Sequence, residues 1–306
     1  MHTTYRYISV IPMMLTGATM DLITLREVRT PRSREELVFA KGDRALGGGT
    51  WLYSEPQEGL EALVDLTTMG WQDLERTASG IVLAATCTVA TVRELSDVSL
   101  FQQCADSLLA SWKIHRFATI GGNIALALPA GSMTSLCVAL DAIAVIWNAT
   151  TERRMPVAEL VLGVQSTALE PDEVIRAIEF SAGPLAFGGT TATALTGYLK
   201  GTGTLVTGRV DDTGEAVFTV SGGTTRPHQL RFDELPSERA LVNAVSGIHD
   251  WYLDAHGSPD WRRAMSVLFA EELRDELSRP RWNDTRHDTQ HDTQHDTQND
   301  RQEGLA

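Results

Sequence analysis

Residues 118–131 read ATIGGNIALALPAG, and the interpretation of the whole chain starts from this stretch. Gly121 and Gly122 stand side by side, directly before an apolar run that Pro129 interrupts. Glycine weakens the interior of helices and strands, and it suits positions where the backbone turns tightly or where another group approaches closely. The stretch therefore predicts a tight turn or a close-approach site at the two glycines.

A second glycine segment, ALGGGTWL, occupies residues 45–52. Both segments place consecutive glycines beside Thr or Asn, and neither carries Lys or Arg. Such segments bind anions through the fixed dipoles of backbone N–H groups. Each segment alone is consistent with a simple turn, and for GGGT alone a turn is preferred, but two such segments favour an anion site, with a pyrophosphate as a natural ligand.

Two common nucleotide-binding motifs are absent from these segments. Neither matches G-x-G-x-x-G followed by a helix and a distal acid, the pattern of nicotinamide-dinucleotide sites. Neither matches G-x-x-x-x-G-K-[ST], the phosphate loop of nucleotide hydrolases. The residues alone therefore leave the ligand open.

Composition narrows the class of protein. The chain has 306 residues and a net charge of −14, so binding to nucleic acid, which requires a basic surface, is not expected. Cys87, Cys104 and Cys137 form no C-x-x-C pair, which argues against a zinc site, an iron–sulfur cluster and a disulfide framework. No stretch is long and apolar enough to span a membrane. These features favour a cytoplasmic protein.

The two ends of the chain are predicted to lie outside the folded part. Residues 1–19 are interpreted as an extension ahead of a domain that begins near Met20. Residues 281–306 contain the tandem repeat HDTQHDTQHDTQ, whose residues have almost nothing to bury, so we expect a disordered tail. The histidines recur every four residues, but a solvated tail is favoured over a metal site.

The body of the chain predicts an α+β fold with a first domain over 20–181 and a smaller one over 182–280. Strands are predicted at 61–66, 80–89, 144–147 and 174–180, and helices at 35–40, 91–97, 100–118 and 135–142. Thr91 is the expected cap of the second of these helices. In the second domain, residues 211–214 (DDTG) predict a hairpin turn, followed by helices at 236–254 and 258–277, the latter capped by Ser258 with Pro259 in its first turn.

The two glycine segments, about seventy residues apart, resemble motifs of the flavin-binding medium subunit of the molybdenum hydroxylases. That family includes carbon monoxide dehydrogenases and xanthine dehydrogenases. The resemblance covers roughly residues 20–280. Further matching elements are AATCT at 84–88, LEPDEVIRAIEF at 169–180, GRVDDTGEAVFTVSGGTTRPHQL at 208–230 and WRRAMSVLFAEEL at 261–273.

The resemblance implies a fold and a cofactor. The expected fold is a two-subdomain FAD-binding fold of the PCMH/vanillyl-alcohol-oxidase type, followed by a smaller C-terminal α+β domain. The first segment would wrap the FAD pyrophosphate, the second would hold it from the other side, Ser132 would stand at a ribose or ribityl contact, and an apolar residue would lie near a ring of the cofactor. The implied cofactor-binding residues are Leu46, Gly47, Gly48, Gly49, Thr50, Trp51, Thr119, Ile120, Gly121, Gly122, Asn123, Ser132 and Leu169.

The sequence departs from the family pattern at four places. Trp51 stands where Asp or Asn is usual, Leu128 replaces a Ser, and Ser132 replaces an Asp. Residues 181–199 contain no basic residue ahead of Lys200. A cation near a flavin favours its anionic reduced form, so these departures bear on redox tuning and on the use of NAD.

The resemblance also implies a function in a larger enzyme. Electrons would leave a substrate on a molybdopterin-binding large subunit, pass through a 2Fe–2S small subunit and reach FAD on this chain, which would reduce a small-molecule acceptor: NAD, oxygen or a quinone. Two alternatives stay open, a self-contained FAD-dependent oxidoreductase and a degenerate scaffold subunit without catalysis. No catalytic side chain and no metal ligand is expected on this chain.

Four other side chains are assigned to structural roles and one pair to the surface. Trp112 is expected in the core, Asp141 is expected to cap or pair, and Cys87 and Cys137 are expected to be buried. His115 and Arg116 precede the second glycine segment, and surface packing is favoured for both over a role at the flavin edge.

Overall fold

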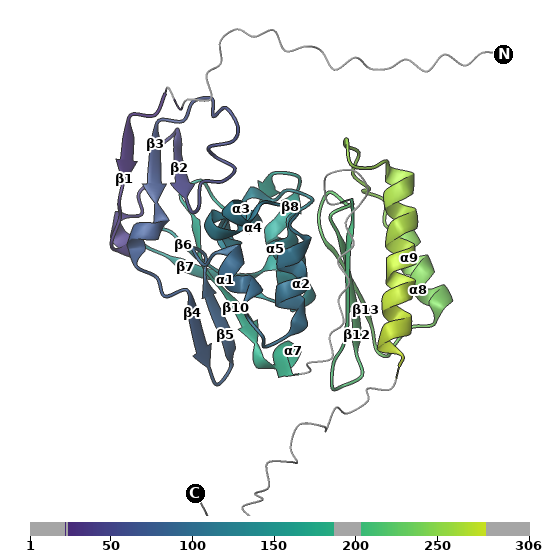
Figure 1. Cartoon of the computed structure of the whole chain (residues 1–306). Coiled ribbons are helices and arrows are strands. Elements are labelled where there is room, and N and C mark those ends of the chain that lie inside the picture. Colours follow the sequence, from purple (N-terminus) through teal and green to yellow (C-terminus); the bar gives the residue numbers. More distant parts are fainter. Residues whose placement is uncertain (1–21, 23, 187–202, 280–306) are drawn as a thin grey trace, which may run out of the picture.

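The computed structural model describes residues 22, 24–186 and 203–279 of the chain. The predicted extension 1–19, the repeat tail 281–306 and most of the segment 181–199 lie outside the described residues. The fold is mixed α+β, and Figure 1 shows three layered parts side by side.

The first part is a small parallel sheet of order β1-β3-β2. Its strands are β1 (Glu27–Arg29), β2 (Asp43–Leu46) and β3 (Ala62–Asp65), accompanied by short 3₁₀ helices at Arg34–Glu36 and Leu66–Met69. Leu63 and Val64 of the central strand are fully buried, with Leu37 and Leu46 among the residues around them. Because β2 ends at Leu46, the first glycine segment begins at the carboxyl edge of this sheet.

The second part is a five-stranded antiparallel sheet of order β4-β5-β10-β6-β7. Helices pack against it and share one core, in which the rings of Phe101 and Phe180 meet edge to face at 5.2 Å. The strands are β4 (Leu74–Thr77), β5 (Gly80–Ala84), β6 (Ile143–Trp147), β7 (Glu152–Pro156) and β10 (Val174–Ser181), with the hairpin β8 (Val161–Gly163) and β9 (Ser166–Thr167). The helices are α1 (Val89–Arg93), α2 (Ser99–Ser107), α3 (Trp112–Phe117), α4 (Ile120–Leu126), α5 (Ser132–Ala139), α6 (Val157–Leu160) and α7 (Ala182–Ala186).

The third part is the antiparallel sheet β11 (Leu205–Val210), β12 (Ala216–Ser221) and β13 (His228–Phe232). Helices α8 (Glu238–Ser246) and α9 (Pro259–Leu277) cover one of its faces, and α5 of the second part contacts β11 and β12. Figure 1 shows the sheet lying between these two layers of helices. Its core, which includes Phe218, Leu241 and Phe269, is separate from the core around α5.

Several predicted elements are confirmed. The strands expected at 61–66, 144–147 and 174–180 correspond to β3, β6 and β10, and the hairpin at 211–214 joins β11 to β12. Ser258 caps α9 by accepting a hydrogen bond from the Trp261 amide at 3.3 Å, and Pro259 occupies the first turn. The domain boundary near residue 182 stays a prediction.

Four local predictions are wrong in their bounds or caps. The helix expected at 35–40 is a 3₁₀ turn that stops at Glu36, because Leu37 turns inward to the core. The strand expected to reach residue 89 ends at Ala84. The next helix begins at Val89, capped by Thr88 rather than Thr91, since the Thr88 hydroxyl accepts the Thr91 amide at 3.1 Å. The helix expected to reach residue 254 ends at Ser246.

Candidate cofactor-binding site

The two glycine segments lie against each other. A Cβ atom on Gly47 would stand 2.8 Å from the Thr119 hydroxyl, and one on Gly48 would stand 1.5 Å from the Phe117 carbonyl oxygen. Any side chain at Gly48 would therefore overlap backbone atoms of the other segment. The packing explains why the first segment needs glycine, and it places the two segments at one site.

The second segment is the first turn of a helix, not the loop that was expected. Its four amides are already engaged: Ile120 and Gly121 donate to the carbonyls of Cys87 and Ala85, both at 2.9 Å. Gly122 donates to the Thr119 hydroxyl at 3.1 Å. The Asn123 amide donates to the Thr119 carbonyl at 2.9 Å. Thr119 thus caps α4. This segment therefore presents a ligand with a surface to lie against and with a hydroxyl group, rather than with free backbone amides.

The first segment has the opposite property. Within the described part of the chain, the amides of Gly47, Gly48, Gly49 and Thr50 donate no hydrogen bond, although all four residues are half-buried. Gly49 has a φ of +70°, a left-handed conformation that turns the segment sharply. Backbone amides left unpaired in a turn attract anions, so this segment has the donor groups that an anion site needs.

The glycine segments border a cavity of about 90 Å³. Gly47, Thr119, Gly121, Gly122 and Leu169, all predicted site residues, line it. Gly122 is exposed, whereas Gly121 is buried because a Cβ there would come within 2.5 Å of the Ala85 Cβ. Gly122 therefore faces the space in which a ligand can lie, whereas Gly121 packs closely against Ala85 of the protein itself.

Leu169 is held at this cavity by an ion pair. The guanidinium of Arg153 donates to both carboxylate oxygens of Glu173, at 2.7 and 2.6 Å, and also to the Ala168 carbonyl at 2.7 Å. The Glu170 amide donates to the same carboxylate at 2.9 Å. The hydrogen bond from Arg153 lowers the pKa of Glu173 despite the opposing effect of burial. This clamp fixes the residues on either side of Leu169.

Five predicted site residues point elsewhere. Leu46 and Ile120 are buried in the core, because each begins or ends an element whose inward face must be apolar. The Asn123 carboxamide oxygen accepts the Met133 amide at 3.0 Å and so ties α4 to α5. Trp51 is 38% exposed, and Ser132 is fully buried. None of these five side chains lines the cavity, and Gly48, Gly49 and Thr50 of the first segment are not among its lining residues either.

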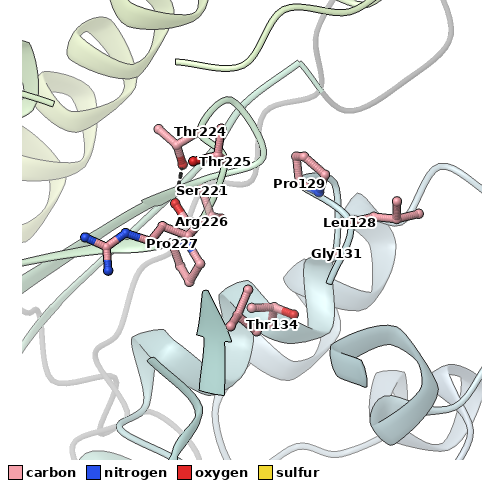
Figure 2. A pocket seen from close by; sticks show the side chains of 10 residues that line it. Leu128, Pro129, Gly131, Thr134, Ser221, Thr224, Thr225, Arg226 and Pro227 are labelled. Carbon is pink, nitrogen blue, oxygen red and sulfur yellow. Dashed lines mark hydrogen bonds between the residues drawn. The ribbon is translucent and has the colours of Figure 1, made fainter. Parts of the chain in front are cut away.

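Ser132 lies near a second, much smaller cavity between α5 and the turn after β12. Figure 2 shows Leu128, Pro129 and Thr134 on one side of it and Thr224 and Pro227 on the other. Its volume of about 10 Å³ suits a single water molecule. The hydroxyls of Ser132 and Thr134 are buried and have no partner among the described residues. The boundary between the second and third parts of the fold is therefore polar here.

Among the residues just before the second segment, one side chain is exposed where burial was expected. Trp112, expected in the core, is 66% exposed, so that prediction is wrong. His115 is half-buried with its Nε2 atom 2.9 Å from the Leu108 carbonyl oxygen, and the exposed Arg116 guanidinium lies 5.9 Å from the Trp112 ring centroid. These positions agree with the packing role expected for both residues.

The assignments of the buried cysteines and of Asp141 are confirmed as well. All three cysteines are free and buried, and burial raises the pKa values of Cys87 and Cys104 to about 12. Asp141 forms ion pairs with Arg209 and Arg231. Across the described ranges, no group of three or more His, Cys, Asp or Glu side chains is placed to hold a metal ion. Among the same residues, no helix combines the length and apolar character that a membrane crossing requires.

Sequence reasoning missed two residues that shape the cavity. Ala85 meets Gly121, and Glu173 clamps the segment around Leu169. Both lie in stretches that match the family, AATCT and LEPDEVIRAIEF, but nothing in either residue type indicates a contact with the site. Only the contact itself reveals them.

Comparison with known proteins assigns the chain to a family. Residues 25–181 match the family described as the FAD binding domain in molybdopterin dehydrogenase, and the chain belongs to this family. It is accordingly a subunit of a molybdopterin dehydrogenase oxidoreductase. No match was found among curated proteins.

Solved structures share the fold over most of the chain. A reconstituted CO dehydrogenase from Oligotropha carboxidovorans aligns with a TM-score of 0.72 and 20% identity, covering 83% of this chain and 97% of that chain. A carbon monoxide dehydrogenase from Hydrogenophaga pseudoflava gives 0.69 and 19%, covering 82% and 96%. Quinoline 2-oxidoreductase from Pseudomonas putida 86 gives 0.67 and 18%, covering 82% and 96%. The similarity thus extends beyond residue 181 into the C-terminal sheet and helices.

Proposed function

We propose that this chain is the FAD-binding electron-transfer subunit of a molybdopterin-dependent hydroxylase or dehydrogenase. The observation that carries the proposal is the pairing of the two glycine segments inside the residues that match the FAD-binding family. Its fold would be the two-subdomain FAD-binding type, with residues 20–181 holding the cofactor and residues 182–280 forming the smaller domain.

The residues present fit a dinucleotide with a pyrophosphate. The unpaired amides of Gly47 to Thr50 would donate to phosphate oxygens, and they would do so without a cationic side chain. Gly122 leaves room for a ligand beside Thr119, because the one atom near its missing Cβ is the Thr119 hydroxyl oxygen, 2.9 Å away. Leu169 supplies an apolar contact for a ring.

The cavity constrains how the cofactor would lie. Its volume of about 90 Å³ is well below the roughly 300 Å³ at which pockets for drug-sized ligands begin. FAD would therefore occupy the cavity with one part and extend along the surface with the rest. Trp51 is exposed next to the free amides and would cover such an extended ligand, whereas Ser132 is buried.

The chemistry of this subunit would come from its cofactor and its partners. FAD, when bound, supplies the ability to accept electrons singly and to donate them in pairs. This chain's own residues would bind and orient it through the free amides of the first segment, and they hold Leu169 in place through Arg153 and Glu173. The partners would be a molybdopterin-binding large subunit and a 2Fe–2S small subunit, and the acceptor would be NAD, oxygen or a quinone.

An absorbance spectrum of the purified chain tests the proposal. We expect a yellow protein that releases about one FAD per chain on denaturation and that oxidises no substrate without its partner subunits. A chain that turns over a substrate alone would instead be a self-contained oxidoreductase. Colourless protein that takes up no added FAD would contradict the proposal and leave the scaffold alternative.

A further inference from the structure

A third stretch of the chain borders the cofactor cavity besides the two glycine segments. It is the turn between β5 and α1, which the Cys87 amide closes by donating to the Ala84 carbonyl at 2.9 Å. Thr86 lies inside this turn and lines the cavity together with Gly122 and Thr119 of the second segment. The turn therefore brings to the site a side-chain hydroxyl that belongs to neither glycine segment.

The second glycine segment holds Thr86 in place from both sides. The carbonyl of Ala85 accepts the Gly121 amide, and the carbonyl of Cys87 accepts the Ile120 amide, both at 2.9 Å. The Ala85 amide also donates to a carbonyl of β10 at 3.0 Å. Because both neighbours of Thr86 are hydrogen-bonded to the start of α4, the backbone of Thr86 cannot move relative to that helix without breaking these bonds. Its position at the cavity is therefore fixed before any ligand binds.

Thr86 is the one lining residue whose polar side chain is uncommitted. The cavity has two other polar side chains, and both already take part in hydrogen bonds: the Thr119 hydroxyl accepts the Gly122 amide at 3.1 Å, and the Glu173 carboxylate is bonded to Arg153. Among the described residues, neither the hydroxyl nor the backbone amide of Thr86 forms a hydrogen bond, although the residue is half-buried. Both groups of Thr86 are therefore available to a ligand in the cavity.

The available groups at the cavity suit a ligand that accepts hydrogen bonds. Gly47, which also lines the cavity, has an unpaired amide, and Thr86 adds an amide and a hydroxyl from another segment. No Lys or Arg lines the cavity, and the charge of its one carboxylate, on Glu173, is balanced by Arg153. Neutral donors from two segments suit a group with several anionic oxygens, and a pyrophosphate is such a group.

We infer that Thr86 donates a hydrogen bond from its hydroxyl to a pyrophosphate oxygen of the cofactor and is a third binding element of the site. The inference rests on the proposed function, because the pyrophosphate is that of FAD. A hydroxyl that donates to an anionic oxygen forms a stronger hydrogen bond than it forms with a neutral oxygen. The hydroxyls of the ribityl chain are neutral, so they gain less from this donor than the pyrophosphate does.

Binding of FAD and of ADP to the full chain tests this contact. ADP has the two linked phosphates of FAD but neither the flavin nor the ribityl chain. Thr86→Val keeps the shape of the side chain and removes the donor, and we expect it to weaken the binding of both ligands by the same factor, about tenfold, equivalent to 1.4 kcal/mol. Thr86→Ser keeps the hydroxyl and should bind both ligands nearly as tightly as the wild type. Isothermal titration calorimetry on the FAD-free protein measures the dissociation constants.

The matched control is Thr207→Val, which should change neither affinity. The Thr207 hydroxyl also has no partner among the described residues, but it lies on β11 and does not line the cavity. Thr86→Ala, which lacks the hydroxyl as well, should show the loss seen with Thr86→Val, and thermal unfolding of the FAD-free variants separates binding from folding. Weaker FAD binding with unchanged ADP binding, or no change in either, would overturn the inference alone. A wild-type chain that binds no FAD would contradict the proposed function as well.

Discussion

The guanidinium of Arg209 is bonded to the carboxylate of Asp141, with Nη2 2.5 Å from Oδ2, across the boundary between the second and third parts of the fold. Asp141 follows α5 in a left-handed conformation with a φ of +53°. Arg209, on β11, has a side chain only 3% exposed and also donates to the Ala139 carbonyl and to Asp211. A buried cation thus ties the C-terminal sheet to the end of α5, the helix that Asn123 joins to α4 of the glycine segment.

Removing the charge of Asp141 should loosen this connection. We expect Asp141→Asn to reduce the free energy of unfolding by about 2–3 kcal/mol, somewhat less than the usual cost of breaking a buried pair, because Arg209 keeps Asp211. Asn tolerates the left-handed backbone, so the change isolates the charge. Urea unfolding followed by fluorescence measures it.

The control for this substitution is a pair on the surface. Arg93 and Asp106 form a bidentate contact with both side chains about half exposed. Asp106→Asn should cost less than about 1 kcal/mol, as exposed ion pairs do. Equal losses for Asp141→Asn and Asp106→Asn would show that the buried contact has no special role.

The adjacent glycines of the second segment should respond differently to the same substitution. Gly121→Leu should destabilise the fold by about 1–3 kcal/mol, because its Cβ would stand 2.5 Å from the Ala85 Cβ and 2.8 Å from the Ala85 carbonyl oxygen. Gly122→Leu should fold normally and lose FAD, because the new side chain points into the space beside Thr119. Thermal unfolding and FAD content, measured on both variants, separate the two roles.

A Gly122→Leu protein with full FAD content would contradict the placement of the cofactor. A smaller change, Gly122→Ala, is the matched intermediate, and it should reduce FAD retention less than Leu does. Loss of folding in both Leu variants would assign both glycines to packing alone.

The sequence correctly predicted that the two glycine segments lie together, but it did not predict that the second segment is helical. Two adjacent glycines argue against a helix, since each costs about 1 kcal/mol relative to alanine. α4 nevertheless begins at Ile120, because Ile120 and Ile124 are fully buried and Thr119 caps the helix. Tertiary burial outweighed local propensity, and no local pattern carries that information.

Trp112 shows a second kind of failure. The stretch at 100–118 was interpreted as one helical region, and in a continuous helix the indole would share the inward face of α2. The structure breaks the region after Ser107 and restarts it at Trp112, with Ser111 as the new cap. The break changes the phase of the helix and turns the indole outward. Ser107 and Ser111 can each cap a helix, so the sequence of this stretch does not show where the second helix begins.

The three thiols should be unreactive in the native protein. Burial raises the pKa values of Cys87 and Cys104 to about 12 and raises that of Cys137 well above its ordinary value, so almost no thiolate forms at pH 8. We expect a thiol-specific chromogenic reagent to label fewer than one cysteine per chain until denaturant is added, and three afterwards. Rapid labelling of one thiol in the folded protein would contradict the burial of that residue.

Glu173 should couple pH to the cofactor site. Because Arg153 lowers the pKa of Glu173 in the folded state, the carboxylate stabilises the fold at every pH above its unfolded value near 4.5, and this contribution disappears as the pH falls through the lower folded value. Glu173→Gln removes it at all pH values and frees the segment around Leu169. We expect the variant to bind FAD several-fold more weakly at pH 7 and to lose the acid-dependent part of its stability.

The control is Glu179→Gln. It disrupts a more exposed ion pair, between Glu179 and Arg154, the neighbour of Arg153 on β7, and it should change neither property. Titration with FAD at pH 7 and thermal unfolding between pH 3 and pH 7 measure both effects, and identical behaviour of the two variants would show that the Arg153–Glu173 clamp does not position the site.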